Sequence, residues 1–537
     1  LSVEMLPDLP VDLRWLMKTA ISILYFISRV YFCIVNAFFS LYNLFVPRLS
    51  VVPTNEELLT ISATQAAKAI RDKEITSSEL LEAYIKRIEE VNPIINAVVL
   101  RNFEEARRKA AEADAEVAQA DEQALDEIAS KRPLLGVPFT IKDCIEVEGL
   151  RLTCGVYHRR NTVGSKNAVV VDRMLAAGAI CLAVTNVPEV CMWWESSNTL
   201  FGRTRNPYDS RRIAGGSSGG EAALIAAAGS LIGVGSDIGG SIRMPAFFNG
   251  VFGLKPTPGV IPLDGHHPEA VGYRQQMLRI GPICRYANDL TLMYKVLGGQ
   301  RVVDELRIDE PTKMKHLRVF YMDGLNTPLV EAASGAMNKT LRRSVRYLEL
   351  KYDLAAVRID LPLLHRAIEL FVGAMHVEGA PKFHELLSDA PDGINIAKEA
   401  GKWLIGQSPH TFPALLVALV DAAPKLSDLQ YAQLKKMRER LQREISDLLG
   451  DDGVLLFPSF AHTAPFHNQP IFTPLNFAFT GIFNAVALPV VQCPMGVGGD
   501  GLPLGVQVVG APNADRNLIA IAKDLEEGFG GWQQSVF

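Results

Sequence analysis

Residues 213–243 contain the densest run of small residues in the chain, and this stretch limits the possible folds more than any other segment. Two glycine-flanked serine clusters, at 215–220 and 237–241, enclose the apolar segment 222–228, for which we expect a buried helix. Each cluster then falls at a helix end or in a tight loop. Glycine permits positive φ and lets a bound group approach main-chain N–H groups that a Cβ would shield. Successive N–H groups that point into one concavity form an anion site and can stabilise an oxyanion.

Three motifs occur in order along the chain: G-V-P-F-T-I-K-D at 136–143, G-G-S-S-G-G at 215–220 and D-I-G-G-S-I-R at 237–243. Together they resemble the amidase signature family, and the similarity extends from about Ser62 to about Trp532. The resemblance implies an α/β fold with a central mixed, twisted β-sheet that helices cover on both faces. It also implies a hydrolase of the Ser-Ser-Lys type rather than the Ser-His-Asp type.

The resemblance assigns the reaction to three side chains. Ser241 would be the nucleophile, Ser217 the bridging serine after a cis peptide bond at Gly216, and Lys142 the base. An amide is a poor electrophile with a worse leaving group, so the site must activate a hydroxyl, stabilise an oxyanion and protonate the departing nitrogen. One lysine can serve both proton transfers if it starts uncharged, a form that burial favours.

Further residues have supporting roles in the same resemblance. We expect Gly216, Asp237 and Arg243 to shape the loop, the last two as a structural ion pair. The oxyanion hole would consist of the N–H groups of Ile238, Gly239, Gly240 and Ser241. Substrate contacts are expected from Cys191, Met192, Trp194 and Ser218, and Ser218 is expected to hydrogen-bond locally rather than to attack.

A rival mechanism arises because residues 216–220 also fit G-x-S-x-G, the nucleophile elbow of α/β-hydrolases. That elbow needs a preceding strand, and residues 206–212 have no strand character. His462 and His467 are downstream candidates for its histidine, but neither has a clear partner in the sequence. No metal, nucleotide or nicotinamide motif occurs, so we expect no metal and no cofactor.

The segment 21–46 is apolar with one charge, Arg29, and is long enough to cross the roughly 30 Å of hydrocarbon in a bilayer. Its aliphatic and aromatic side chains outweigh the roughly 2.5 to 3.5 kcal/mol that Arg29 costs at mid-membrane. We therefore expect a spanning or embedded anchor, with a long signal peptide or an interfacial helix as alternatives. The chain starts at Leu1 rather than at methionine, so we expect the native start to be missing or processed.

The rest of the chain alternates between helical and strand patterns, which is typical of α/β layering. Two helices are expected in 58–91, ending at Asn92-Pro93, and one or two surface helices in 103–130. Further helices are expected at 168–174 and 516–527, and buried strands at 134–141, 179–186, 317–322, 454–458 and 504–509. We divide the chain into an anchor at 1–50 and a catalytic domain at 51–537.

Residues 398–424 contain an apolar run that is too short to span a membrane. It is either a core helix or a membrane-facing cap beside a substrate entrance. The cap is a feature of the fatty acid amide hydrolase branch, type 2-like, which the chain resembles most closely because of its anchor and of the apolar residues near Cys191. That branch implies the hydrolysis of fatty acid amides to a fatty acid and an amine.

Two other functions stay open: an amidase for small non-lipid amides or esters, and a catalytically silent membrane-bound interaction protein. The net charge of −5 and the lack of a basic stripe argue against nucleic acid as a partner. A lipid amide, a membrane and a second copy in a homodimer are the partners we consider. The seven cysteines contain no C-x-x-C pair, which favours reduced thiols in a cytosol-facing body on an intracellular membrane.

Overall fold

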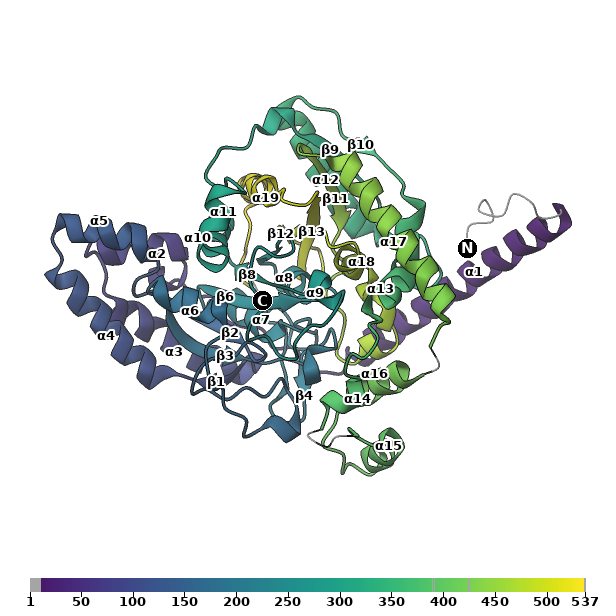
Figure 1. Cartoon of the computed structure of the whole chain (residues 1–537), viewed down its shortest axis with the longest axis horizontal. Helices are drawn as coiled ribbons and strands as arrows, with labels where there is room; N and C mark the ends of the chain where they lie inside the picture. The colour runs from purple at the N-terminus through teal and green to yellow at the C-terminus, as the bar shows by residue number, and fades with distance from the viewer. Residues whose placement is uncertain (1–10, 389, 391, 424, 536–537) are drawn as a thin grey trace.

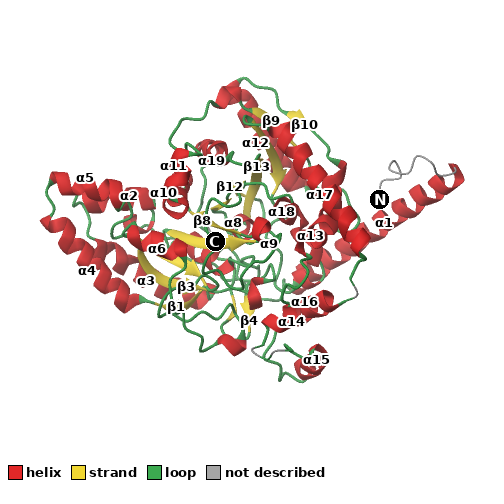
Figure 2. Cartoon of the chain, viewed as in Figure 1, coloured by secondary structure: helices red, strands yellow, loops and turns green. Residues whose placement is uncertain are grey.

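The structure is a computed structural model of the 537-residue chain, and it describes residues 11–388, 390, 392–423 and 425–535. Residues 1–10 of the predicted anchor lie outside the described residues. Within the described residues, eleven strands form one sheet in the order β1-β3-β2-β6-β8-β7-β12-β13-β11-β9-β10 (Figures 1 and 2). β2 runs parallel to β3 and β6, and β9 runs parallel to β10 and β11, whereas the other pairs are antiparallel. The predicted α/β fold with a mixed central sheet is confirmed.

The strands of this sheet are short, and most are buried along their whole length. They are β1 (Val98–Arg101), β2 (Pro138–Lys142), β3 (Ile180–Thr185), β6 (Ile232–Asp237), β7 (Phe252–Lys255), β8 (Arg279–Cys284), β9 (Arg318–Tyr321), β10 (Val357–Arg358), β11 (Gly453–Pro458), β12 (Val490–Val497) and β13 (Pro503–Gly510). A separate hairpin joins β4 (Ser197–Asn198) to β5 (Gly202–Arg203). Because the central strands are buried, the loops at their ends are held by a rigid frame.

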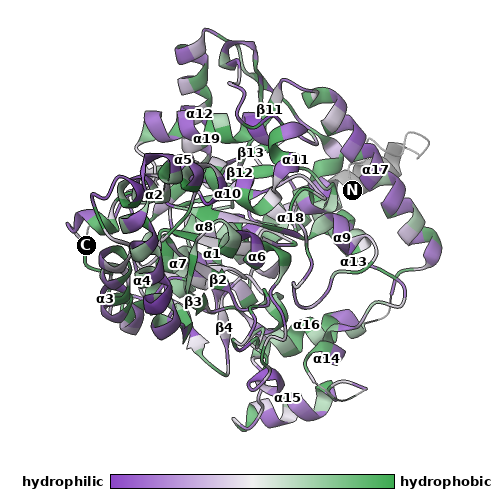
Figure 3. Cartoon of the chain, turned by 60° about the vertical axis from the view of Figure 1, so that its left-hand side comes forward, coloured by the Kyte–Doolittle hydropathy of each residue, from purple (hydrophilic) through white to green (hydrophobic). Residues whose placement is uncertain are grey.

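Helices flank the sheet, and their hydrophilic sides face outward, as the purple stretches of α12 and α17 show in Figure 3. The helices used below are α2 (Ala63–Arg71), α3 (Ser77–Ile95), α4 (Phe103–Gln119), α5 (Glu122–Lys131), α6 (Val169–Ala176), α7 (Gly219–Ala226), α8 (Arg243–Phe248), α9 (Arg274–Met277), α12 (Gly335–Tyr352), α15 (Ile396–Leu404), α16 (Phe412–Ala422), α17 (Asp428–Leu449), α18 (Ala478–Ala485) and α19 (Asp515–Phe529).

Most expected elements are present within a few residues of their predicted bounds. The end of α3 is one place where the small difference has an identifiable cause. We predicted that Asn92-Pro93 would end this helix, but it continues to Ile95. The Asn92 side chain accepts hydrogen bonds from the N–H groups of Ala97 (2.7 Å) and Val98 (2.8 Å), which follow the helix. Pro93 therefore lies in a last turn that side-chain contacts hold together.

The N-terminal helix α1 (Val11–Tyr42) has two different faces. By length and composition alone, Thr19–Tyr42 could cross a membrane, and only 6 % of its most apolar window is buried inside the protein. The face that includes Val35 and Phe39 packs on the body, next to Phe466. The opposite face is apolar and exposed, as at Ile34 (62 % exposed). The helix ends at Tyr42, four residues before the end of the predicted apolar segment.

Helices α15 and α16 form an apolar protrusion with many exposed side chains, labelled at the bottom of Figure 1. Leu404 is 78 % exposed, and Leu419 and Val420 are 58 % and 67 % exposed. Only Ala414, Leu415 and Ala418 of α16 are buried. The expectation of a core helix is therefore wrong, because one side of α16 faces outward.

Candidate active site

Lys142 is the last residue of β2, and its side chain is completely buried. Its Nζ lies 2.7 Å from Ser217 Oγ, and it contacts Ser236 twice, at 3.0 Å from Oγ and 3.2 Å from the carbonyl oxygen. The end of a strand in an α/β sheet is a usual position for a functional residue. The structure thus brings the predicted base to the predicted bridging serine.

Ser217 and Ser241 come from two loops that meet beside Lys142. The peptide bond between Gly216 and Ser217 is cis, as expected. The main-chain N–H of Ser218 donates to the carbonyl oxygen of Ser241 at 3.2 Å, which joins the two loops. Both Ser217 and Ser241 line one cavity of 110 Å³. Two of the three residues that the sequence assigned to chemistry therefore line one small space, and Lys142 contacts one of them, Ser217, from the core.

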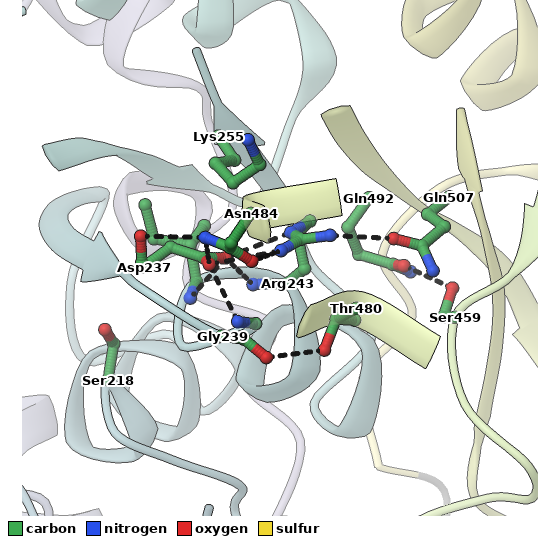
Figure 4. Close-up of polar contacts among 12 residues, drawn as sticks. Ser218, Asp237, Gly239, Arg243, Lys255, Ser459, Thr480, Asn484, Gln492 and Gln507 are labelled. Carbon is green, nitrogen blue, oxygen red and sulfur yellow. Dashed lines mark hydrogen bonds and ion pairs between the residues drawn. The ribbon is translucent and has the colours of Figure 1, made fainter. Parts of the chain in front are cut away.

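A completely buried ion pair of Asp237 and Arg243 lies next to the loop that contains Gly239 (Figure 4). Arg243 donates from Nε to Asp237 Oδ2 at 3.0 Å and from Nη2 to Oδ1 at 3.1 Å. Its other hydrogen bonds go to Gln507 (3.0 Å) and Asn484 (2.6 Å). Burial raises the pKa of Asp237, but the charge and hydrogen bonds of Arg243, together with Lys255 and Asn484, outweigh burial and hold that pKa well below its usual range. The predicted ion pair is present and contacts only the loop and the core.

The loop amides are not equivalent. The Gly240 N–H donates to Asp237 Oδ1 at 2.7 Å. This amide is therefore not free to bind an oxyanion, and the prediction that all four amides would do so is wrong for Gly240. The N–H groups of Ile238, Gly239 and Ser241 make no hydrogen bond within the described part of the chain. These three remain as donors for a bound group.

Two predicted substrate contacts are not at the cavity. Trp194 is 4 % exposed, donates from Nε1 to the carbonyl oxygen of Pro474 and packs on Phe460 in the core. Ser218 is completely buried and bonds only main-chain groups, including the carbonyl oxygen of Ser236 at 3.3 Å. Both expectations of substrate contact are corrected, since these side chains are used inside the fold. Cys191 and Met192 do line the cavity with Ser217 and Ser241.

A second, larger cavity of 610 Å³ lies beside the first. Met192 and Phe383 line both cavities. The walls of the larger cavity also include Trp193, Trp403, Phe412 and Phe472. The two spaces therefore adjoin, and the larger one reaches the apolar protrusion of α15 and α16.

Sequence reasoning missed several residues that the structure brings to the site. Ser236 lies within the glycine-rich run but was not considered, and His266 also lines the small cavity. Thr480 donates to the carbonyl oxygen of Gly239 at 2.8 Å. Asn484, also on α18, donates to Asp237 Oδ1 at 2.8 Å. These residues carry no motif, and only the position of Ser236 beside Asp237 could have marked it.

The nucleophile elbow is not formed. In the described part of the chain no histidine contacts Ser218. His467 instead pairs with Glu195 at 2.8 Å, and His462 lies 3.6 Å from Glu331. Among the described residues, no group of three or more His, Cys, Asp or Glu side chains could hold a metal ion. All seven cysteines are free thiols, and six are buried.

Comparison with known proteins gives consistent results. Residues 79–519 match the family model described as Amidase. The chain is 42 % identical over 489 residues to fatty-acid amide hydrolase 2 of Homo sapiens, covering 89 % of this chain and 91 % of that protein. It is 40 % identical to fatty-acid amide hydrolase 2-A of Danio rerio, covering 95 % and 97 %. A solved fatty acid amide hydrolase structure has the same fold, with a TM-score of 0.70 at 23 % identity, covering 89 % and 87 %.

Proposed function

We propose that this chain, which belongs to the amidase family, hydrolyses the amide bond of fatty acid amides at a membrane and releases a fatty acid and an amine. The observation that carries the proposal is the 2.7 Å contact between Lys142 and Ser217, a serine that lines the same cavity as Ser241. The substrate class is supported by relatives at 40 % and 42 % identity that are named fatty-acid amide hydrolases.

The reaction would use Ser241 as the nucleophile. Uncharged Lys142 takes a proton from Ser217 while Ser217 takes one from Ser241, whose oxygen attacks the carbonyl carbon. The C–N bond then breaks as the proton returns through Ser217 to the departing nitrogen, so that an amine leaves and an ester remains on Ser241. Water, activated by the same chain of groups, hydrolyses this ester to the fatty acid.

The negative oxygen of the intermediate would be stabilised by the N–H groups of Ile238, Gly239 and Ser241. Removing one such donor in other hydrolases costs roughly 2.7 to 4 kcal/mol of transition-state stabilisation. The bonds from Gly240 to Asp237 and from Thr480 to Gly239 fix the loop before substrate binds. A loop that is already in place needs no reorganisation during the reaction.

The cavities support a long apolar substrate. The small cavity, at 110 Å³, has room for little more than the reacting group, whereas half of the residues that line the adjoining 610 Å³ cavity are apolar or aromatic. Met192 and Phe383, which line both, would be the passage between the two. An acyl chain could then extend from Ser241 toward the protrusion of α15 and α16.

Membrane binding would involve α1 together with α15 and α16. One side of α1 is bonded to the body: Tyr25 donates to the carbonyl oxygen of Asn326 (2.9 Å), and Asn36 to Glu331 (3.0 Å). Because one side of α1 is bonded to the body, α1 is better placed to embed in the membrane next to the body than to cross the bilayer as a separate helix. The large cavity is lined both by Phe472, which packs on Phe39 of α1, and by residues of the protrusion. Lipid substrate would therefore enter between the two apolar elements.

Two measurements test the proposal. A fluorophosphonate probe should form a covalent adduct on Ser241 in the wild-type protein and none in Ser241→Ala, with Ser218→Ala as the matched control. An adduct on Ser218, or no adduct at all, would contradict the assignment. Hydrolysis of oleamide and of acetamide in detergent then distinguishes a lipid amidase from one for small amides. Labelling without hydrolysis of either amide would favour a non-lipid ester or another amide as substrate.

A further inference from the structure

A second polar chain starts from Lys142 on the side away from Ser217. Lys142 Nζ lies 3.0 Å from Ser236 Oγ, and Ser236 Oγ lies 2.9 Å from His266 Nε2. His266 Nδ1 lies 3.1 Å from the carbonyl oxygen of Pro268. His266 is 5 % exposed and lines the same cavity as Ser217. An imidazole therefore stands one hydroxyl away from the proposed base.

The donors and acceptors of this chain can be assigned from chemistry. A carbonyl oxygen only accepts, so His266 Nδ1 carries a hydrogen, and in the neutral ring Nε2 is then an acceptor. The hydrogen of the Ser236 hydroxyl points to that acceptor, which leaves the Ser236 oxygen to accept from Lys142.

An uncharged amine has two hydrogens and one lone pair. The two hydrogens of Lys142 match Ser236 Oγ and the Ser236 carbonyl oxygen, so the lone pair faces Ser217. This is the arrangement that the proposed reaction needs.

Protonation of His266 would reverse the direction of the hydrogen bond between His266 and Ser236. Nε2 would then donate to the Ser236 oxygen, and the Ser236 hydrogen would have to turn away from the imidazole. Its remaining neighbours are the Lys142 nitrogen and the Cys144 sulfur, at 3.6 Å, and sulfur is a weak acceptor. The hydroxyl of Ser236 would then compete with Ser217 for the lone pair of Lys142.

We infer that His266 is a positioning residue that orients Lys142 through Ser236, and that protonation of His266 turns the site off. The inference rests on the proposed Ser-Ser-Lys function. Histidine is suited to this role because its charge ordinarily changes between about pH 5 and 8.

Few other titratable groups face this imidazole. From the segment after β2, Cys144 Sγ lies 3.4 Å from Nε2, with Cys191 next to Cys144. The neighbouring His267 turns to Glu146, at 3.1 Å, rather than to the cavity. Charged groups that line the same cavity come from three further segments: Glu269, Arg274 of α9 and Asp421 of α16. The Ser236 hydroxyl joins His266 to Lys142, and it also lies 3.6 Å from Cys144 Sγ.

The test measures the rate at which a fluorophosphonate labels Ser241 between about pH 5.5 and 9, so no substrate has to be assumed. If protonation of Lys142 and protonation of His266 each inactivate the site, the labelling rate of the wild type falls about 100-fold per pH unit once the pH is below the midpoints of both protonations. In His266→Gln only one protonation remains, and the rate should fall about 10-fold per pH unit. Glutamine keeps an acceptor near the position of Nε2 but does not titrate. His266→Leu has no acceptor and should label at least about tenfold more slowly than His266→Gln at every pH.

His267→Gln is the matched control, since it removes a titrating ring from the next position and should keep the wild-type profile. Melting temperatures within a few degrees of the wild type show that the variants are folded. The inference is overturned if His266→Gln keeps the wild-type slope, if His267→Gln changes it equally, or if His266→Leu labels as fast as His266→Gln. A wild-type protein that takes no label at any pH overturns the proposed function itself, and this result differs from all the others.

Discussion

Replacing Asp237 by asparagine should destabilise the protein strongly, although the two side chains have nearly the same shape. The carboxylate accepts hydrogen bonds from Arg243, from the N–H groups of Gly240 and Ile242, and from Asn484. Asparagine removes the charge and turns one acceptor into a donor, so that the buried guanidinium loses its counter-ion. Losing one partner of a buried pair costs about 3 to 5 kcal/mol. We expect a loss of this size in the free energy of unfolding.

The assay is urea unfolding followed by tryptophan fluorescence, combined with the rate of Ser241 labelling. The double variant Asp237→Asn, Arg243→Gln removes both charges and should be more stable than the sum of the two single losses predicts. The pH dependence of this stabilisation follows from the pKa of Asp237. The pKa of Asp237 is held well below its usual range, so its stabilisation is present above about pH 4 and is lost only as pH falls further. The deficit of the variant should thus stay constant from about pH 8 to about pH 4. A loss under about 1 kcal/mol, or strict additivity in the double variant, would refute the reasoning.

Three further predictions concern separate parts of the molecule. Lys142→Ala should slow hydrolysis of an amide more than that of the matching ester, because an alkoxide leaves with less help from a proton; equal losses would argue against proton return. Burial, partly offset by hydrogen bonds, raises the pKa of Glu221 to about 8, so the folded protein holds a proton that the unfolded chain releases. Wild-type stability should therefore fall relative to Glu221→Gln by up to about 1.4 kcal/mol per unit as pH rises from about 5 to 8, which urea unfolding at several pH values measures, and a parallel profile would exclude this. The double variant Leu419→Glu, Val420→Glu should bind phospholipid vesicles less in a flotation assay, while labelling of Ser241 in detergent stays unchanged. Unchanged flotation would show that α16 is not part of the membrane-binding surface.

The parts of the site that the sequence predicts best are those in which distant motifs share one chemical task. Lys142, Ser217 and Ser241 each lie in a glycine-containing motif, and the fold brings the two serines to one cavity and Lys142 to Ser217. The ion pair of Asp237 and Arg243 was also expected, since the two are close in the chain and opposite in charge. Their role as a support for the loop could be argued from this spacing alone.

The remaining residues were out of reach for identifiable reasons. Asn484 and Gln507 bond Arg243 across more than two hundred residues, and neither has a local pattern. The family resemblance implied a substrate contact for Trp194, whereas in the structure its neighbour Trp193 lines the larger cavity. Val190 and Cys191 have positive φ just before the two tryptophans, a conformation that the sequence gives no reason to expect at a β-branched residue.

The strands beside the site were missed for a different reason. β6 reads I-G-V-G-S-D and β8 reads R-I-G-P-I-C, so glycine and proline hide their strand character. In β6 the glycines are needed because a Cβ at Gly233 would come within 2.0 Å of the Glu221 carboxylate. Close packing at the site requires glycine in this strand, and glycine lacks the β propensity by which a strand is recognised in a sequence.

Strand β6 also has a consequence for how this chain tolerates insertions and deletions. Ser236 and Asp237 are successive residues, so their side chains leave opposite faces of the sheet, one toward Lys142 and the other toward Arg243. Deleting one residue from the turn at 229–231 and sliding the strand by one position would exchange these directions, and proton transfer and loop support would fail together. We therefore expect this turn to accept substitutions far more readily than changes in its length.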